Sequence, residues 1–269
     1  MPDKIVLVTD ITWPSTAPEA KVLETVGARL LLAQTGSEEE LLALVPQADA
    51  ILTCFKKVSA AVIRAGPKLQ VVGRYGIGVD NIAVDEATRL GIPVTNVPAY
   101  CLDEVAEHVM ALILACARQV VRYNAAVHAG TWSLKTGMPL FRVRGRALGI
   151  IGFGKIGRTL AEKAQAFGMR VLAHAPRANP ESLRAHGVQP ASLEELLHEA
   201  DFVSIHTPLT PATRGLMNAE RLRSMKPTAY LINTARGAVI DPAALLQALR
   251  EGWIAGAAVD VFDPEPIPA

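Results

Sequence analysis

The stretch Leu148-Gly149-Ile150-Ile151-Gly152-Phe153-Gly154-Lys155-Ile156-Gly157 decides the fold. Its first four residues form an apolar run typical of a buried strand, its glycines fit G-x-G-x-x-G, and an apolar-periodic helix follows. In that context the first glycine permits a tight turn, the second lets the backbone approach a pyrophosphate, and the third allows close helix–strand packing. The helix N-terminus adds N–H groups and positive potential. The stretch predicts a dinucleotide-binding βαβ unit; a glycine-rich turn in another α/β protein is the alternative.

Outward from this unit, short apolar runs alternate with helical patterns along the whole chain. Alternation of this kind predicts βαβ units, and continuously apolar strands indicate a parallel sheet covered on both faces. We expect one long helix at 103–123, then an irregular stretch at 130–145. The other expected strands are 4–8, 29–33, 49–54, 69–74, 93–97, 147–151, 170–173, 202–205, 229–233 and 255–259, and the other expected helices are 19–26, 37–45, 59–64, 84–90, 155–167 and 242–250.

Composition excludes several classes of protein. The 269 residues carry a net charge of +1, so no broad basic field is available for nucleic acid or anionic lipid. The apolar run 5–8 is too short for a signal peptide core, and 109–117 is too short to span a bilayer. The three cysteines stand far apart without metal spacing. We therefore expect a cytoplasmic protein that binds neither nucleic acid nor membrane and holds no metal.

The end of the second strand of the nucleotide unit bears on the choice of cofactor. An NAD site usually carries an acid about 20 residues after the glycine loop, which binds the ribose 2′-hydroxyl. Here the sequence reads Ala173-His174-Ala175-Pro176-Arg177, with no acid before Glu181. A missing carboxylate removes repulsion of a 2′-phosphate, and Arg177 can pair with one. The pattern slightly favours NADP over NAD; the alternative is a solvated Arg177 and poor discrimination.

Several further motifs occur in one order along nearly the whole chain. They are Arg74-Tyr75-Gly76-Ile77-Gly78-Val79-Asp80-Asn81, Asn96-Val97-Pro98, the loop 152–157, His206-Thr207-Pro208-Leu209-Thr210-Pro211-Ala212-Thr213, Met225-Lys226-Pro227, Ile232-Asn233-Thr234-Ala235-Arg236-Gly237 and Ala257-Ala258-Val259-Asp260-Val261-Phe262. Together they resemble the D-isomer-specific 2-hydroxyacid dehydrogenases, and most closely a bacterial, phosphoglycerate dehydrogenase-like branch similar to C-terminal-binding proteins. The resemblance implies two doubly wound parallel-sheet α/β domains: a flavodoxin-like substrate domain at 1–99 and a Rossmann domain at 100–269 that binds NAD(P).

The resemblance also implies roles for single residues. Arg236 matches the catalytic arginine that binds the carboxylate and carbonyl of a 2-oxo acid, and its rigid, permanently charged fork suits planar oxygens. Glu265 matches the glutamate that keeps the catalytic histidine protonated, and Asp260 matches the residue that holds the nicotinamide carboxamide. Cys54, Ile77 and Gly78 would line the substrate site. The other implied cofactor contacts are Gly152, Gly154, Lys155, Ile156, Gly157, Ala175, Arg177, His206, Thr207, Pro208, Thr213, Thr234, Ala235 and Arg236.

Each of these roles has a structural alternative. Arg236 could make bonds at a helix entry, Asp260 could brace a strand end, and Glu265 could be solvated. The family's catalytic histidine lies downstream of the match to Glu265, past Ala269, and none of the six histidines occupies its position. We therefore expect a truncated chain that lacks the acid, a final strand of the Rossmann domain and the segment that returns to the first domain.

Three functions follow as alternatives. The leading one is an NAD(P)-dependent enzyme that interconverts a small 2-oxo acid and its D-2-hydroxy acid, with glyoxylate, hydroxypyruvate or 3-phosphoglycerate-like acids as candidates. The second is a nicotinamide-sensing interaction protein, and the third an inactive fragment. The resemblance further implies a homodimer, with the helix 103–123 and the loop 130–145 at its interface and Trp132, Leu134 and Phe141 facing the partner. The alternative is a loop that covers its own domain.

Overall fold

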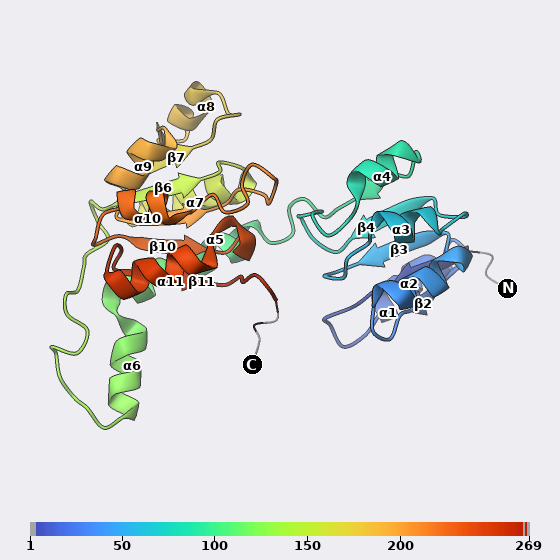
Figure 1. Cartoon of the computed structure of the whole chain (residues 1–269), viewed down its shortest axis with the longest axis horizontal. Coiled ribbons are helices and arrows are strands. Elements are labelled where there is room, and N and C mark those ends of the chain that lie inside the picture. Colours follow the sequence, from blue (N-terminus) through green and yellow to red (C-terminus); the bar gives the residue numbers. More distant parts are fainter. Residues whose placement is uncertain (1–3, 266, 268–269) are drawn as a thin grey trace. The chain divides into compact units, whose positions relative to one another are not determined.

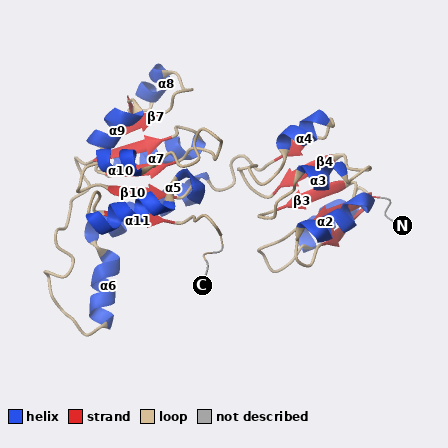
Figure 2. Ribbon diagram, in the orientation of Figure 1, coloured by secondary structure: helices blue, strands red, loops and turns tan. Residues whose placement is uncertain are grey.

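A computed structural model describes residues 4–265 and 267. The chain divides into two compact units, Met1–Tyr100 and Cys101–Ala269, which are considered one at a time. In each unit a parallel sheet is flanked by helices (Figures 1 and 2). The prediction of two parallel-sheet α/β domains is confirmed.

The sheet of unit 1 has the strand order β2-β1-β3-β4-β5, with every pair parallel. This is the flavodoxin-like order, in which the direction of winding reverses between β1 and β3. Its strands are β1 (Lys4–Val8), β2 (Ala28–Leu32), β3 (Ala50–Thr53), β4 (Val71–Arg74) and β5 (Val94–Thr95). Its helices are α1 (Ala17–Glu24), α2 (Glu38–Leu44), the 3₁₀ turn η1 (Val45–Gln47), α3 (Ala60–Arg64) and α4 (Val84–Arg89).

The sheet of unit 2 has the order β11-β10-β9-β6-β7-β8, again parallel throughout. Counted from β6 this is the Rossmann order 3-2-1-4-5-6, with the reversal between β6 and β9. Its strands are β6 (Ala147–Ile151), β7 (Arg170–His174), β8 (Gln189–Pro190), β9 (Phe202–Ile205), β10 (Tyr230–Asn233) and β11 (Gly256–Val259). Its helices are α5 (Leu102–Arg118), α6 (Val120–His128), α7 (Lys155–Ala166), α8 (Pro180–Ala185), α9 (Leu193–Glu199), α10 (Ala219–Ser224), the 3₁₀ turn η2 (Gly237–Val239) and α11 (Pro242–Glu251).

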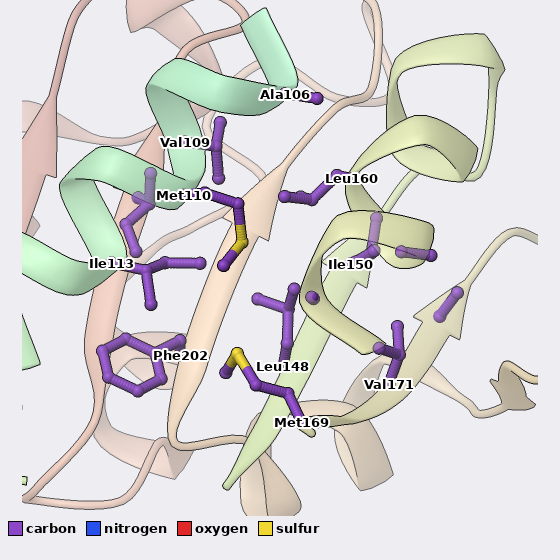
Figure 3. Packing of buried hydrophobic residues seen from close by; sticks show 14 of the residues in the cluster. Ala106, Val109, Met110, Ile113, Leu148, Ile150, Leu160, Met169, Val171 and Phe202 are labelled. Atoms are coloured by element: carbon purple, nitrogen blue, oxygen red, sulfur yellow. The ribbon is translucent and has the colours of Figure 1, made fainter. Parts of the chain in front are cut away.

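The core of unit 2 lies on both faces of its sheet, as continuously apolar strands require. All five residues of β6 are buried. On one face α5 and α7 pack over the sheet, and Figure 3 shows side chains from both helices meeting those of the strands. The labelled residues of this cluster include Ala106, Val109, Met110, Ile113, Leu148, Ile150, Leu160 and Phe202. A second cluster, with α9, α10 and α11, covers the other face.

The prediction of one helix over 103–123 is wrong. The helix ends at Arg118, and α6 begins at Val120 after Gln119 adopts the left-handed conformation with φ 53°. The Gln119 side chain donates to the Cys116 carbonyl at 3.0 Å and to the Tyr230 hydroxyl at 2.7 Å. Apolar periodicity continues across the break, so the pattern did not reveal this tertiary anchor.

Four short elements of unit 2 were missed by the periodicity argument. They are α8, β8, α9 and α10, each seven residues or fewer. A local signal existed for α9: Ser192 and Glu195 form a capping box, with the Ser192 hydroxyl accepting from the Glu195 N–H and the Glu195 carboxylate accepting from the Ser192 N–H.

The irregular stretch after α6 contains one residue that departs from expectation. Trp132 and Leu134 are exposed, at 89% and 82%. Phe141, expected to face a partner, instead packs against the core of its own unit, and the Arg146 guanidinium lies 4.9 Å from its ring centroid. Its backbone N–H donates to the Ala117 carbonyl, which ties the loop to the end of α5.

Candidate cofactor and substrate sites

The three glycines of the predicted dinucleotide loop differ in their surroundings. Gly152 has φ +97°, and a Cβ there would lie 2.6 Å from the His206 carbonyl oxygen. A Cβ on Gly157 would lie 2.6 Å from the Gly152 carbonyl oxygen, so this glycine lets α7 approach the strand. Gly154 is exposed, and a Cβ there would meet nothing within 4 Å. The first and third glycines are therefore explained by the protein itself, whereas the second leaves open space.

The open side of Gly154 lies where the sequence predicts the pyrophosphate of a dinucleotide. Gly154 is the N-cap of α7 and has no side chain that could accept from the N–H groups of the first turn, which begins with Lys155 and Ile156. A pyrophosphate is the kind of group that such donors and the helix dipole bind. The loop also lies beside the reversal of strand order between β6 and β9, where ligands of open α/β sheets bind.

The end of β7 carries the residues expected to meet the adenosine ribose. The His174 carbonyl accepts from the Gly152 N–H at 2.9 Å, which joins this strand end to the glycine loop. Ala175 is partly buried and packs against the core, while Arg177 is exposed. Within residues 4–265, no carboxylate forms an ion pair with Arg177.

The segment after β9 is held by its own side chains. The Ser204 hydroxyl lies 2.8 Å from His206 Nε2, and desolvation lowers the pKa of His206 from 6.5 to about 4. The ring is therefore neutral at physiological pH and suited to packing or hydrogen bonding rather than charge. The Thr213 hydroxyl donates to the Pro208 carbonyl at 2.7 Å and bonds within the turn of Thr210. Thr207 lies partly exposed between these anchors.

The turn with Arg236 is built on a buried amide. Asn233, which ends β10, is fully buried; its Nδ2 donates to the Arg236 carbonyl at 2.9 Å, and its Oδ1 accepts from the Ala235 N–H at 3.0 Å. Arg236 Nη1 donates to the Ala235 carbonyl at 2.7 Å. Sequence reasoning gave Asn233 no separate role, although a polar residue that ends a buried apolar strand is a usable signal. The Thr234 hydroxyl is buried without a protein partner in the described part of the chain.

The segment 260–265 lies directly against this turn. A Cβ on Gly237 would stand 2.1 Å from the Phe262 carbonyl carbon, so the two backbones are in contact. Asp260, whose N–H donates to the Asn233 carbonyl at 2.9 Å, has an exposed carboxylate 3.6 Å from His108 Nε2 on α5. The Glu265 carboxylate accepts from the Phe262 N–H at 2.6 Å. Arg236, Asp260 and Glu265 thus belong to one connected region of unit 2.

The expected carboxylate loop of unit 1 is held by its carbonyl groups. Asn96 Nδ2 donates to the Ile77 carbonyl at 2.8 Å, and the Val97 N–H donates to the Gly76 carbonyl at 3.0 Å. Among the described residues, no protein group accepts from the N–H of Ile77 or Gly78. Two neighbouring backbone donors are consequently available to an anion.

The expected substrate loop after β3 is also anchored. Cys54 is 4% exposed, and burial raises the pKa of its thiol, so this side chain is an unreactive core group. The next residue, Phe55, is exposed. Of the Cys54–Phe55–Lys56 loop, the side chains that solvent reaches are therefore those of Phe55 and Lys56.

Other kinds of site find no support in the described residues. No cluster of three or more His, Cys, Asp or Glu side chains among them has the arrangement of a metal site. Over the same residues, no helix is both long and apolar enough to cross a membrane.

Comparison with known proteins places both units in one family. Residues 6–186 match the model of the D-isomer specific 2-hydroxyacid dehydrogenase catalytic domain, and residues 110–269 match that of the corresponding NAD binding domain. The glyoxylate reductase of Thermococcus onnurineus is 44% identical over 238 residues, covering 86% of this chain and 71% of that protein. The glyoxylate reductase of Aeropyrum pernix is 45% identical over 236 residues, covering 85% and 70%.

Solved structures agree. A glyoxylate reductase from Paecilomyes thermophila superposes with a TM-score of 0.89 at 31% identity, over 99% of this chain and 84% of that one. A D-lactate dehydrogenase from Aquifex aeolicus, complexed with NAD and lactic acid, superposes with a TM-score of 0.88 at 31% identity, over 97% and 77%. The match of two family models in succession and the identity to these relatives leave one assignment: the chain belongs to the D-isomer specific 2-hydroxyacid dehydrogenase family.

Proposed function

We propose that this protein reduces glyoxylate, and less readily larger 2-oxo acids, with NAD(P)H. The observation that carries the proposal is the grouping at one edge of the unit 2 sheet. The dinucleotide loop follows β6, His206 follows β9, the Arg236 turn follows β10 and Asp260 follows β11. The carboxyl ends of parallel strands meet at one edge, which is where open α/β sheets bind ligands. The names of the glyoxylate reductases that resemble this chain support the choice of acid.

The cofactor, when bound, supplies the hydride for the carbonyl carbon of the acid. The glycine loop and the N-terminus of α7 would hold its pyrophosphate, and the Asp260 carboxylate would hold its carboxamide. Asp260 is suited to this task because its backbone N–H is fixed to Asn233 while its carboxylate is exposed.

Each unit has its own candidate group for the acid in this proposal. In unit 1 the candidates are the N–H groups of Ile77 and Gly78, which suit a carboxylate, and in unit 2 the candidate is the Arg236 guanidinium, which suits a carboxylate and a carbonyl oxygen. The Asn233 side chain holds the Arg236 turn, so the guanidinium is presented from a fixed backbone. Glu265 would support a histidine that protonates the carbonyl oxygen, and its bond to Phe262 keeps it in the segment that touches the Arg236 turn.

We further propose that NADPH is accepted at least as well as NADH. Ala175 offers no carboxylate to the ribose, and Arg177 is exposed near the end of β7 without a carboxylate partner in the described chain. A guanidinium is well matched to a 2′-phosphate.

A homodimer completes the proposal. Helix α6 projects from the body of unit 2 (Figure 1) and exposes Val121, and the loop after it exposes Trp132 and Leu134. Exposed apolar side chains concentrated on one projecting arm are typical of an interface. Sedimentation of wild type and of a Trp132→Ser, Leu134→Ser double variant would test this: the wild type is expected as a dimer, and a wild-type monomer would contradict the proposal.

The function itself is tested by oxidation of NADPH and NADH with glyoxylate, hydroxypyruvate and pyruvate, in wild type and Arg236→Ala. We expect turnover with glyoxylate that Arg236→Ala abolishes while cofactor binding persists. Because the family's histidine acid follows the match to Glu265, the chain is assayed alone and joined to the C-terminal segment of a glyoxylate reductase relative. Cofactor binding without turnover in both forms would refute a reductase; equal activity in Arg236→Ala would refute the role of Arg236.

A further inference from the structure

The end of β1 and the loop after β3 stand at the reversal of strand order in the sheet of unit 1. Asp10 follows β1 by two residues, and the loop Cys54–Phe55–Lys56 follows β3 directly. The crevice outside such a reversal is the general ligand position of open α/β sheets. Asp10 was not among the candidate site residues found in the sequence, although it too is polar and follows a buried strand.

The Asp10 carboxylate binds the whole backbone of that loop. It accepts from the N–H of Cys54 at 3.0 Å, of Phe55 at 2.7 Å and of Lys56 at 3.3 Å. The Thr9 hydroxyl donates to it at 2.6 Å. Burial acts to raise the pKa of Asp10, but the bonds from Thr9, Phe55, Cys54 and Lys56 outweigh burial and lower that pKa. The carboxylate is therefore ionised and is the anchor of three successive donors.

The carbonyl side of the same loop is held as well. Asn81 Nδ2 donates to the Lys56 carbonyl at 2.8 Å and to the Cys54 carbonyl at 3.4 Å. The Thr53 hydroxyl also donates to the Lys56 carbonyl, at 2.8 Å. Because Asp10 occupies all three N–H groups, the loop has none left for a substrate anion. The groups that this loop can still offer to a substrate are therefore its side chains, which the fixed backbone holds in place.

The side chain in question is that of Phe55, which is 67% exposed. The Arg74 guanidinium carbon lies 5.7 Å from its ring centroid. Arg74 Nε in turn donates to Asn81 Oδ1 at 3.2 Å, and a Cβ on Gly76 would lie 2.9 Å from Arg74 Nη1. Arg74 therefore lies close both to the Phe55 ring and to Gly76, the residue that precedes the donors proposed for the acid's carboxylate.

We propose that Asp10 is a positioning residue for substrate selection: it fixes the loop so that the Phe55 ring limits the size of the substituent on C2 of the 2-oxo acid. The inference rests on the proposed function, because it takes Ile77 and Gly78 as the carboxylate loop. Glyoxylate carries only hydrogen at that position and passes the limit, whereas hydroxypyruvate carries a hydroxymethyl group that meets the ring.

The test is the ratio of kcat/KM for glyoxylate to kcat/KM for hydroxypyruvate, measured in the form of the protein that turns over in the assays above. Phe55→Ala is expected to lower this ratio about tenfold, the scale of discrimination by one small group in a pocket. Asp10→Ala should lower it in the same direction although the ring is present, and Asp10→Asn, which keeps one acceptor oxygen, should fall between. Asp49→Ala is the matched control, because that carboxylate accepts from the Ile5 N–H at the opposite end of β1.

Amide hydrogen exchange measures separately whether Asp10 holds the loop 54–56, a role called the clamp below, independently of any effect on turnover. Asp10→Ala should speed exchange at 54–56 and leave exchange in β1 and β3 slow; if that variant does not fold, Asp10→Asn serves for both measurements. Faster exchange with an unchanged substrate ratio would overturn the role in selection, and an equal loss of kcat/KM for both acids would reduce Asp10 to a structural residue. Absence of turnover in wild type would refute the proposed function and this role together, whereas unchanged exchange in an active Asp10 variant would refute only the clamp.

Discussion

Gly237 and Phe262 touch through their backbones, so closely that a Cβ on the glycine would stand 2.1 Å from the Phe262 carbonyl carbon and 2.2 Å from its oxygen. The contact joins the turn that presents Arg236 to the segment that carries Asp260 and Glu265. A shift of either segment should therefore displace the other.

Substitution of Gly237 by alanine should push the two segments apart. Displacement of a positioning group by about 1 Å is able to cost about 100-fold in rate, so we expect kcat/KM for glyoxylate to fall by about that factor. Gly252→Ala is the control: Gly252 ends α11 with φ +69° and has open space around it, so alanine there should lower stability by about 1–2 kcal/mol without affecting turnover. Full activity of Gly237→Ala would show that the contact is not needed.

Gly152 and Gly154 allow fold and cofactor binding to be separated. Gly152→Ala should lower the thermal midpoint, because φ +97° is strained for alanine and its Cβ would overlap the His206 carbonyl. Gly154→Ala should lower the midpoint less than Gly152→Ala, since its Cβ meets no protein atom and only the N-cap preference for glycine is lost. It should nevertheless weaken NAD(P)H binding at least about tenfold by filling the approach to the pyrophosphate. Thermal unfolding and cofactor fluorescence titration check both. Unchanged cofactor affinity in Gly154→Ala would show that the dinucleotide does not bind at this loop.

The neutral His206 ring makes a prediction for acid stability. Its pKa in the folded protein is about 4, against 6.5 ordinarily, so the unfolded chain binds a proton between these values that the folded protein does not. Stability should therefore fall as the pH drops from 6.5 to 4, by at most about 1.4 kcal/mol per pH unit from this group. Urea unfolding of wild type and His206→Gln at pH 7, 6 and 5 isolates the contribution. The variant should lose less stability than wild type over this range, and parallel losses would contradict a desolvated ring.

Arg177 and Ala175 are expected to control the choice between the two nicotinamide cofactors. Arg177→Ala should weaken NADPH binding about tenfold, equal to about 1.4 kcal/mol, and leave NADH binding unchanged. Ala175→Asp should shift preference toward NADH through the ribose hydroxyl. Arg184→Ala on α8, also an exposed arginine, is the control for a general charge effect. A clear NADH preference in wild type would refute the phosphate role of Arg177.

The fold could be predicted from the sequence more completely than the candidate site. Apolar runs such as Ala147–Ile151 predicted their strands because strands buried on both faces leave little choice of residue. The break at Gln119 was not predictable, because it depends on Tyr230, more than a hundred residues away. Asn233 and Asp10 were missed for a related reason: their function is to hold a loop, and only the fold brings that loop within hydrogen-bond distance.

The central claim is that the chain transfers hydride to a 2-oxo acid, and the most direct measurement follows that hydride. The protein would be incubated with glyoxylate and with NADPH or NADH carrying deuterium at C4 of the nicotinamide, on the face that is transferred, and the glycolate examined by mass spectrometry. The account predicts glycolate with one deuterium on C2, and none from the Arg236→Ala variant. The claim would be contradicted if the cofactor bound tightly but no deuterated glycolate formed. This result would have to hold both for the chain alone and for the chain joined to the C-terminal segment of a glyoxylate reductase relative.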